Sequence, residues 1–266
     1  RSNCDSIIIQ LKKAILATNP RVKFGISPFG VWRNKTQDPR GSETKGGQTN
    51  YDDLYADILL WLEKGWIDYV VPQLYWERGH KLADYDVLLK WWNDYAYGKH
   101  LYIGHGIYRA GTNDAWKSKD QIPDQINLLR SFKTTQGSVF YNSSTFAKNP
   151  NGWNDSLQNN YYKYPALVPP MPWLDDIAPD APSVQKKGTT NVVVNYTGKE
   201  KIKSFGIFSA AAGIKATAKN AQLLQVIMAT KSSTIDIASV PHKKNEKLYV
   251  GSVDLNNNVS SLVELN

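Results

Sequence analysis

The chain has 266 residues, of which 41% are hydrophobic and 21% are charged, and its net charge is +8. A chain of this length and composition can bury a sizeable core, and no apolar run is long enough to cross a bilayer, so we expect no transmembrane segment. The lysines are scattered, and helix-turn-helix, zinc-finger and RNA-binding signatures do not occur. The positive charge therefore does not predict nucleic acid as a partner.

Cysteine and histidine are too sparse to predict cross-links or a metal centre. Cys4 is the single cysteine, which excludes a disulfide within the chain. The four histidines lack the His-x-His and His-x-x-x-His spacings of zinc sites; they are His80, His100, His105 and His242. We expect no metal and no cofactor. The first residue is Arg1, so a signal peptide would lie upstream of it.

Helix-like and strand-like segments alternate through the first part of the chain. Apolar residues at helical spacing predict helices at residues 5–18, 52–64, 84–97, 120–132 and 155–163. Apolar and β-branched runs predict strands at residues 22–27, 68–77, 101–107 and 138–141. Residues 33–50 form a polar loop whose length is uncommon unless the loop is functional or disordered.

This alternation predicts right-handed βαβ units and a parallel sheet. Four such units form either an open sheet or half of a (β/α)8 barrel. The chain begins with a helix, whereas a βα repeat begins with a strand, so we favour the carboxyl-terminal half of a TIM-type barrel over residues 1–165. A half barrel exposes two strand edges, which predicts a covering partner such as a second chain.

The remainder of the chain has a different pattern. Residues 166–182 are rich in proline and predict a linker. All nine tryptophans lie between Trp32 and Trp173, which also separates the chain into two parts. Short alternating strands are predicted at residues 191–196, 204–209, 224–229, 234–237, 248–254 and 259–265. Together they predict a β-sandwich over residues 183–266.

The strand at residues 68–77 carries the leading candidate for catalysis. Because side chains alternate along a strand, Gln73, Tyr75 and Glu77 share one face. Glu77 lies at the carboxyl end of this strand, where ligands bind in parallel α/β folds, and is therefore the candidate catalytic residue. The alternative is a loop glutamate that pairs with Arg78 or is solvated.

Four motifs in order resemble the barrel domain of glycosyl hydrolase-like family ten: residues 24–34, 51–55, 66–76 and 105–109. The resemblance covers roughly residues 2–165. It implies a (β/α)8 barrel that acts on glycosidic bonds, and its bacterial members cleave peptidoglycan glycan strands that lack stem peptides. It also implies a cell-envelope location, including lipoproteins, or secretion. Residues 181–258 are similar, more generically, to a fibronectin type III module.

Nine residues are expected to bind a polysaccharide substrate. Those that match family motifs at strand ends are Arg33, Asn34, Gln73, Tyr75, Trp76, Tyr108 and Arg109, and His105 and Asn142 are added from their positions in or after strands. Arg33 and Arg109 could bind an acidic sugar substituent or close a salt bridge in the rim. His105 could line the site or be hydrogen-bonded in the core. Trp76 could stack on a sugar or pack against helices.

Glycoside hydrolysis typically uses two carboxyl groups, and this sequence offers one good candidate. Asp38, Glu43 and Asp114 lie in loops near the same face, but we expect each to be solvated. The acidic residues of the family's amino-terminal half barrel have no counterpart here. The sequence therefore predicts a glycoside hydrolase acting on a bacterial polysaccharide. The alternatives are a non-catalytic glycan-binding or adhesion protein, and a chain whose active site is incomplete by itself.

Overall fold

A computed structural model describes residues 1–230 and 232–265. The chain divides into two compact units, Arg1–Lys163 and Tyr164–Asn266. Among the described residues, no helix combines the length and apolar character that crossing a membrane requires.

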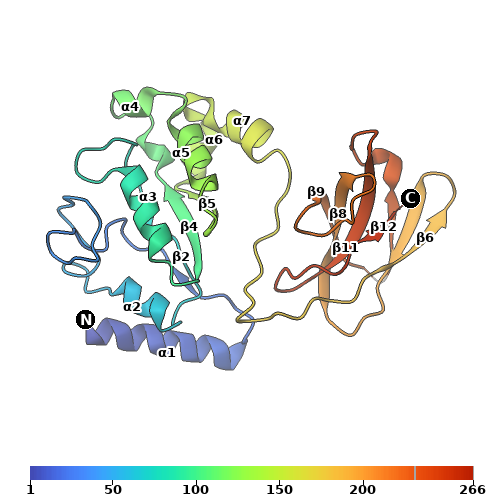
Figure 1. Ribbon diagram of the computed structural model, residues 1–266, viewed down its shortest axis with the longest axis horizontal. Coiled ribbons are helices and arrows are strands. Elements are labelled where there is room, and N and C mark those ends of the chain that lie inside the picture. The colour runs from blue at the N-terminus through green and yellow to red at the C-terminus, as the bar shows by residue number, and fades with distance from the viewer. Residues whose placement is uncertain (231, 266) are drawn as a thin grey trace. The chain divides into compact units, whose positions relative to one another are not determined.

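The first unit is built on a parallel sheet (Figure 1). Its strands are β1 (Gly25–Ile26), β2 (Tyr69–Val70), β3 (Gln73–Leu74), β4 (His100–His105) and β5 (Thr135–Phe140). β1 pairs with β2, β4 pairs with both β2 and β3, and β5 pairs with β4, always in parallel. The strands thus follow chain order across the sheet without reversal, as successive βα units do in an α/β barrel.

The predicted strand at residues 68–77 is interrupted into β2 and β3. Pro72 has no N–H to donate, so the regular ladder breaks around it. Val71 and Gln73 still donate backbone hydrogen bonds to Ile26 and Pro28, at 2.9 and 3.0 Å. The two short strands therefore act as one element and keep its carboxyl end in line with the sheet.

Helices and helical turns connect these strands. They are α1 (Ser2–Thr18), α2 (Ile58–Glu63), α3 (Tyr85–Asp94), η1 (Ile107–Arg109), α4 (Asp114–Lys117), α5 (Gln121–Arg130), α6 (Ser143–Ala147), η2 (Pro150–Gly152), α7 (Trp153–Ser156) and η3 (Leu157–Tyr161). The predicted start of α2 at residue 52 is wrong. Asp57 caps this helix by accepting a hydrogen bond from the Leu60 N–H, and Tyr55, with φ of 53°, excludes helical backbone before it.

The caps of the next two helices differ. Asp84 caps α3, because its carboxylate accepts a hydrogen bond from the Asp86 N–H at 3.0 Å. Asp120 precedes α5, but its side chain makes no capping hydrogen bond.

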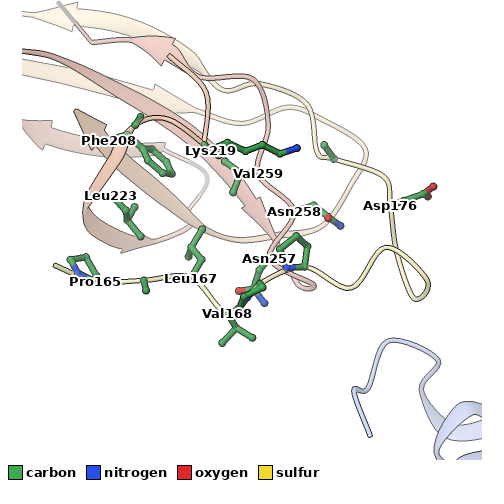
Figure 2. Close-up of a pocket in the computed structure, with 16 residues that line it drawn as sticks. Pro165, Leu167, Val168, Asp176, Phe208, Lys219, Leu223, Asn257, Asn258 and Val259 are labelled. Carbon is green, nitrogen blue, oxygen red and sulfur yellow. The ribbon is translucent and has the colours of Figure 1, made fainter. Parts of the chain in front are cut away.

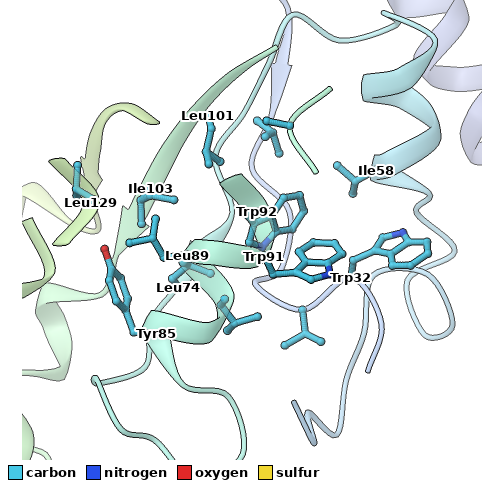
Figure 3. Packing of buried hydrophobic residues seen from close by; sticks show 14 of the residues in the cluster. Trp32, Ile58, Leu74, Tyr85, Leu89, Trp91, Trp92, Leu101, Ile103 and Leu129 are labelled. Atoms are coloured by element: carbon cyan, nitrogen blue, oxygen red, sulfur yellow. The ribbon is translucent and has the colours of Figure 1, made fainter. Parts of the chain in front are cut away.

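The core of the first unit lies between the sheet and the helices (Figure 3). Leu101 and Ile103 of β4 and Leu74 of β3 are fully buried on this face. Trp61, Trp91 and Trp92 are also buried in this core. The residues that alternate with them, such as Tyr69 and Tyr102, lie on the opposite face and are half-buried.

The long loop at residues 33–50 is ordered around a buried asparagine. The Asn34 amide oxygen accepts hydrogen bonds from the Thr44 hydroxyl at 2.9 Å and the Gly46 N–H at 2.8 Å. Its amide nitrogen donates to the Gly46 carbonyl at 2.9 Å. One side chain thus replaces the hydrogen bonds that a strand or helix would supply, and the loop needs no regular structure.

The second unit contains two antiparallel sheets. One has the order β10-β7-β6 and the other β12-β11-β8-β9. The strands are β6 (Ser183–Lys187), β7 (Asn191–Asn195), β8 (Ile202–Ala211), β9 (Gln222–Met228), β10 (Ser232–Asp236), β11 (Glu246–Asp254) and β12 (Val263–Glu264), with the turn η4 (Ile237–Ser239) after β10. Val194 of the first sheet shares a core with Phe205 and Val250 of the second, so the sheets form a sandwich. β6 has no counterpart among the predicted strands, and β12 is shorter than the strand predicted at residues 259–265.

The proline-rich segment at residues 166–182 belongs to the second unit and is not a free linker. Met171 is 1% exposed, and Leu167 packs against the cluster that contains Phe208 (Figure 2). Asp175 accepts a hydrogen bond from the Asn256 amide at 2.9 Å. Leu167 thus ties the segment to the four-stranded sheet within the second unit.

The two methionines test this packing. Met171→Ala should lower the free energy of unfolding of the second unit by about 2–3 kcal/mol, because it opens a cavity under the segment. Met228→Ala, at a position 76% exposed on β9, is the matched control and should change it little. Urea denaturation followed by circular dichroism measures both. Equal stability of the two variants would show that the segment detaches from the sandwich.

Candidate functional site

A buried hydrogen-bond network holds the carboxyl ends of three strands together. His105, at the end of β4, lies 2.9 Å from the Gln125 side-chain oxygen through Nδ1 and 3.1 Å from the Ser138 hydroxyl through Nε2. Gln125 of α5 also donates to the Trp76 carbonyl at 3.1 Å, and Tyr162 donates to Ser138 at 3.0 Å. The network therefore fixes β3, β4, β5 and α5 relative to one another.

His105 is neutral within this network. Its side chain is fully buried, and burial lowers its pKa to about 4, although the hydrogen bond to Gln125 acts in the opposite direction. Because the Gln125 oxygen can only accept, Nδ1 carries the proton and Nε2 accepts from Ser138. The ring stacks against Tyr85 and Phe140. These contacts place His105 inside the fold rather than among residues that can touch a substrate.

Glu77 follows β3 and is held by two donors. Its carboxylate accepts hydrogen bonds from the Asn113 amide at 3.0 Å and the Trp116 indole N–H at 2.9 Å. Burial raises the pKa of Glu77, but hydrogen bonds from its own backbone N–H, Trp116 and Asn113 and the attraction of His80 outweigh it, so the pKa is lowered. The carboxylate is therefore ionised at neutral pH. It does not pair with Arg78, which binds Asp86 instead.

Three tyrosines meet at the carboxyl ends of β3, β4 and β5. The Tyr75 and Tyr141 rings are nearly parallel, with centroids 6.0 Å apart. The Tyr108 ring stands almost perpendicular to both, at 5.7 Å from Tyr75 and 5.8 Å from Tyr141. Burial, with repulsion from the other two hydroxyls, raises the pKa of Tyr75. Gly106 makes room for this cluster, because a Cβ there would lie 2.9 Å from the Tyr75 Cβ.

Arg109 ends η1, directly after Tyr108. Its side chain is half-buried, and its Nε is buried without a hydrogen-bond partner among the described residues. Its guanidinium also forms no ion pair within that part of the chain. A guanidinium in this state is suited to bind an anion.

Gln73 and Trp76 make contacts with residues other than the three tyrosines. The Gln73 amide donates to the Ser27 carbonyl at 3.3 Å. Gln73 also lines a cavity of about 430 Å³ together with residues of β1 and α2. The lining of this cavity includes neither Tyr75 nor Arg109. The Trp76 ring packs edge-on against Phe29, which agrees with the packing alternative for this residue.

Arg33 and Asn34 stabilise the loop at residues 33–50. Arg33 forms a bidentate pair with Asp52, at 2.9 and 3.0 Å, and contacts Asp38 at 3.2 Å. The hydrogen bond to Asp52 raises the pKa of Arg33 despite the opposing effect of burial. The salt-bridge alternative therefore describes Arg33. Asn34 is buried in the network described above and has no free polar group to offer a ligand.

Asn142 and the remaining loop acids are also occupied. The Asn142 side chain caps α6 by accepting from the Thr145 N–H at 2.9 Å. Asp38 binds Arg33 and Arg40, and Glu43 pairs with Lys35. Asp114 is highly exposed and pairs with Lys117 at 2.8 Å. None of these three acids forms a hydrogen bond with Glu77, so they do not supply an evident second carboxyl group.

The structure adds four residues that the sequence did not single out. Asn113 and Trp116 hold Glu77, Gln125 orients His105, and Tyr141 completes the tyrosine cluster. Tyr141 could have been found, because it is the last residue of the fourth predicted strand. The other three come from helix faces and give no local signal. In the described residues, no group of three or more His, Cys, Asp and Glu side chains could hold a metal ion.

Comparison with known proteins shows what the first unit is similar to. The family model described as Glycosyl hydrolase-like 10 matches residues 1–124. The match contains the strand ends that carry Glu77, Tyr75 and Arg109, and it confirms the resemblance predicted from the sequence.

Curated relatives extend the similarity. The chain is 38% identical over 275 residues to Glycosyl hydrolase YngK of Bacillus subtilis (strain 168), which covers 98% of this chain and 52% of YngK. It is 37% identical over 150 residues to Glycosyl hydrolase DigH of Escherichia coli (strain K12), covering 53% of this chain and 34% of DigH. The chain thus spans about half the length of YngK and about a third of DigH.

A solved structure described as "Myokine structure" aligns with 34% of this chain and 94% of its own. The TM-score is 0.22 and the identity 16%, values too low to indicate a shared fold.

The buried histidine predicts a pH dependence of stability. Between its unfolded pKa near 6.5 and its folded pKa of about 4, the unfolded state binds a proton that the folded state does not. Stability of the first unit is therefore full above pH 6.5 and should fall by about 3 kcal/mol as the pH drops to about 4. Urea denaturation across this range measures the slope.

His105→Gln removes the titrating group and should flatten this slope, whereas the exposed His242→Gln in the second unit should leave it as in the wild type. An unchanged slope in His105→Gln would mean that His105 is not the group responsible.

Proposed function

We propose that the protein is a glycoside hydrolase that acts on a bacterial polysaccharide, with peptidoglycan glycan strands as the substrate class. The observation that carries this proposal is the ionised carboxylate of Glu77, fixed by Asn113 and Trp116 just beyond the carboxyl end of β3. It lies within the segment that matches the glycosyl hydrolase-like family, and the relatives named above are glycosyl hydrolases.

The protonation state of Glu77 limits its role in the reaction. A general acid must carry a proton to give to the leaving oxygen, whereas a nucleophile or general base must be ionised. Because its hydrogen bonds lower its pKa, Glu77 is suited to the second role at neutral pH. The two donors also fix the direction of its lone pairs, so little reorganisation is needed when a sugar binds.

The proton donor would then come from a second carboxyl group. In the described residues, β1 and β5 each pair with a strand on one side only, so the sheet can accept further parallel strands at both edges. We propose that the second carboxyl group lies on such strands. They would complete an α/β barrel and would come from further residues of the protein or from a second chain. A barrel brings the carboxyl ends of all its strands to one mouth, which would set the two acids across the substrate.

Arg109 would recognise an acidic group on the glycan. The Nε of its half-buried guanidinium lacks a hydrogen-bond partner within residues 1–230 and 232–265, and the planar fork of arginine matches a carboxylate. Peptidoglycan strands without stem peptides carry carboxylates on alternate sugars, which fits this requirement. A polysaccharide of the cell wall also favours an envelope or secreted location for the protein.

A non-catalytic glycan-binding protein is the second candidate. Both Glu77 oxygens already accept hydrogen bonds, and one carboxylate does not complete a hydrolytic pair. The β-sandwich of the second unit, which we propose is of the fibronectin type III kind, would then serve as an adhesion module.

Substitution of the carboxylate separates these two functions. Glu77→Gln in the full-length protein should reduce kcat on peptide-free peptidoglycan strands by about a hundredfold or more, because an amide cannot act as nucleophile or base. Reducing-end release from purified strands measures turnover. Trp116→Phe, which removes one donor but keeps the carboxylate, should lose only about tenfold.

Wild-type turnover in Glu77→Gln would remove Glu77 from the mechanism. Strand binding by the wild type without any release of reducing ends would establish the binding function instead.

The role of Arg109 is tested with two substrates. Arg109→Met should weaken binding of peptide-free strands about tenfold, and carboxyl-reduced strands should bind wild type and variant alike, because the charge partner is gone. Isothermal titration gives both affinities. A similar loss on the reduced strands would mean that Arg109 does not read a carboxylate.

A further inference from the structure

The three tyrosines at the strand ends form a surface that the fold does not require. Tyr108 and Tyr141 are 43% and 54% exposed, although their rings contact each other and Tyr75. In the described part of the chain, none of the three hydroxyls makes a hydrogen bond to another side chain or to the backbone. Contiguous aromatic rings that remain exposed next to unused polar groups are characteristic of a binding site.

Contacts with the end of β4 fix the geometry of the tyrosine cluster. The Tyr141 N–H donates to the His105 carbonyl at 2.9 Å, so the residue is anchored to the end of β4. Gly106 allows Tyr75 to approach the same strand end closely. The rings of Tyr75 and Tyr141 then lie within 29° of parallel, and Tyr108 stands across them at 85° and 83°.

We propose that Tyr141, with Tyr75 and Tyr108, forms a stacking subsite for one sugar ring of the glycan. The apolar C–H face of a sugar packs on a flat aromatic ring, and the perpendicular Tyr108 closes one side of the subsite. The free hydroxyls hydrogen-bond the sugar's own hydroxyl and amide groups. This inference rests on the proposed glycan substrate and names Tyr141 as the residue that holds it, separate from the carboxylate chemistry of Glu77.

Saccharide fits this surface better than a polypeptide segment does. A docking peptide would bury the three hydroxyls and require a partner for each, whereas a sugar offers a donor or acceptor at almost every carbon. Arg109 follows Tyr108 directly and is the charged residue of η1. A positive charge at this position suits a glycan in which neutral and acidic sugars alternate.

The test uses the full-length protein with two probes, chitohexaose and peptide-free peptidoglycan strands. Tyr141→Ala should weaken binding of both probes about tenfold, whereas Tyr141→Phe, which keeps the ring, should stay within about threefold of wild type. The matched control is Tyr97→Ala, because Tyr97 is an exposed tyrosine that precedes the amino-terminal end of β4. This variant should bind both probes with wild-type affinity. In turnover, Tyr141→Ala should raise KM and leave kcat nearly constant.

Nitration with tetranitromethane provides a measurement that does not depend on a variant. Bound strands should protect Tyr108 and Tyr141 from nitration but leave Tyr97 reactive. Unchanged affinity in Tyr141→Ala, or absent protection of Tyr141, would overturn the subsite. If the strands protect Tyr141 but are not cleaved, the subsite stands and the proposed hydrolysis fails; if they are cleaved while Tyr141 stays unprotected, only the subsite fails.

Discussion

The arrangement of the first unit depends on the hydrogen bonds that a neutral His105 makes beneath the strand ends. One ring nitrogen donates to Gln125 of α5, and the other accepts from Ser138 of β5. Gln125 in turn holds the Trp76 carbonyl, which follows β3. A charged imidazolium could not accept from Ser138, so the low dielectric that keeps His105 neutral also preserves this network.

The hydrogen-bond network also positions the residues that follow the strands. Trp76 lies between Tyr75 and Glu77 in the sequence, so fixing its carbonyl also fixes the chain that carries the tyrosine cluster and the candidate carboxylate. The Tyr141 N–H binds the His105 carbonyl directly. The fold thus separates two groups of residues: a buried layer of histidine, glutamine and serine positions the strand ends, and the tyrosines, Glu77 and Arg109 of the proposed site lie beyond it.

The two faces of the parallel sheet differ in composition and in burial. Leu74, Leu101 and Ile103 pack against helices, so their face is apolar and fully buried. The other face carries glycine and tyrosine, and Val139 of β5 is exposed there. In an α/β barrel this second face points inward, where further strands would complete its burial. The sequential strand order and the open edges of β1 and β5 are both consistent with that arrangement.

The sequence by itself determined the order of strands and helices in the first unit and the family resemblance, because hydrophobic periodicity and contiguous motifs are local properties of the chain. It did not determine which polar residues are free. Arg33 and Arg109 both follow a predicted strand, yet Arg33 binds Asp52, nineteen positions later, whereas the Nε of Arg109 has no hydrogen-bond partner among the described residues. The partners of Glu77 and His105 likewise come from α4 and α5, and the proline-rich segment packs on a sheet formed later in the chain. Only tertiary structure decides such pairings, because each joins groups that are distant in sequence and leaves no periodic signal.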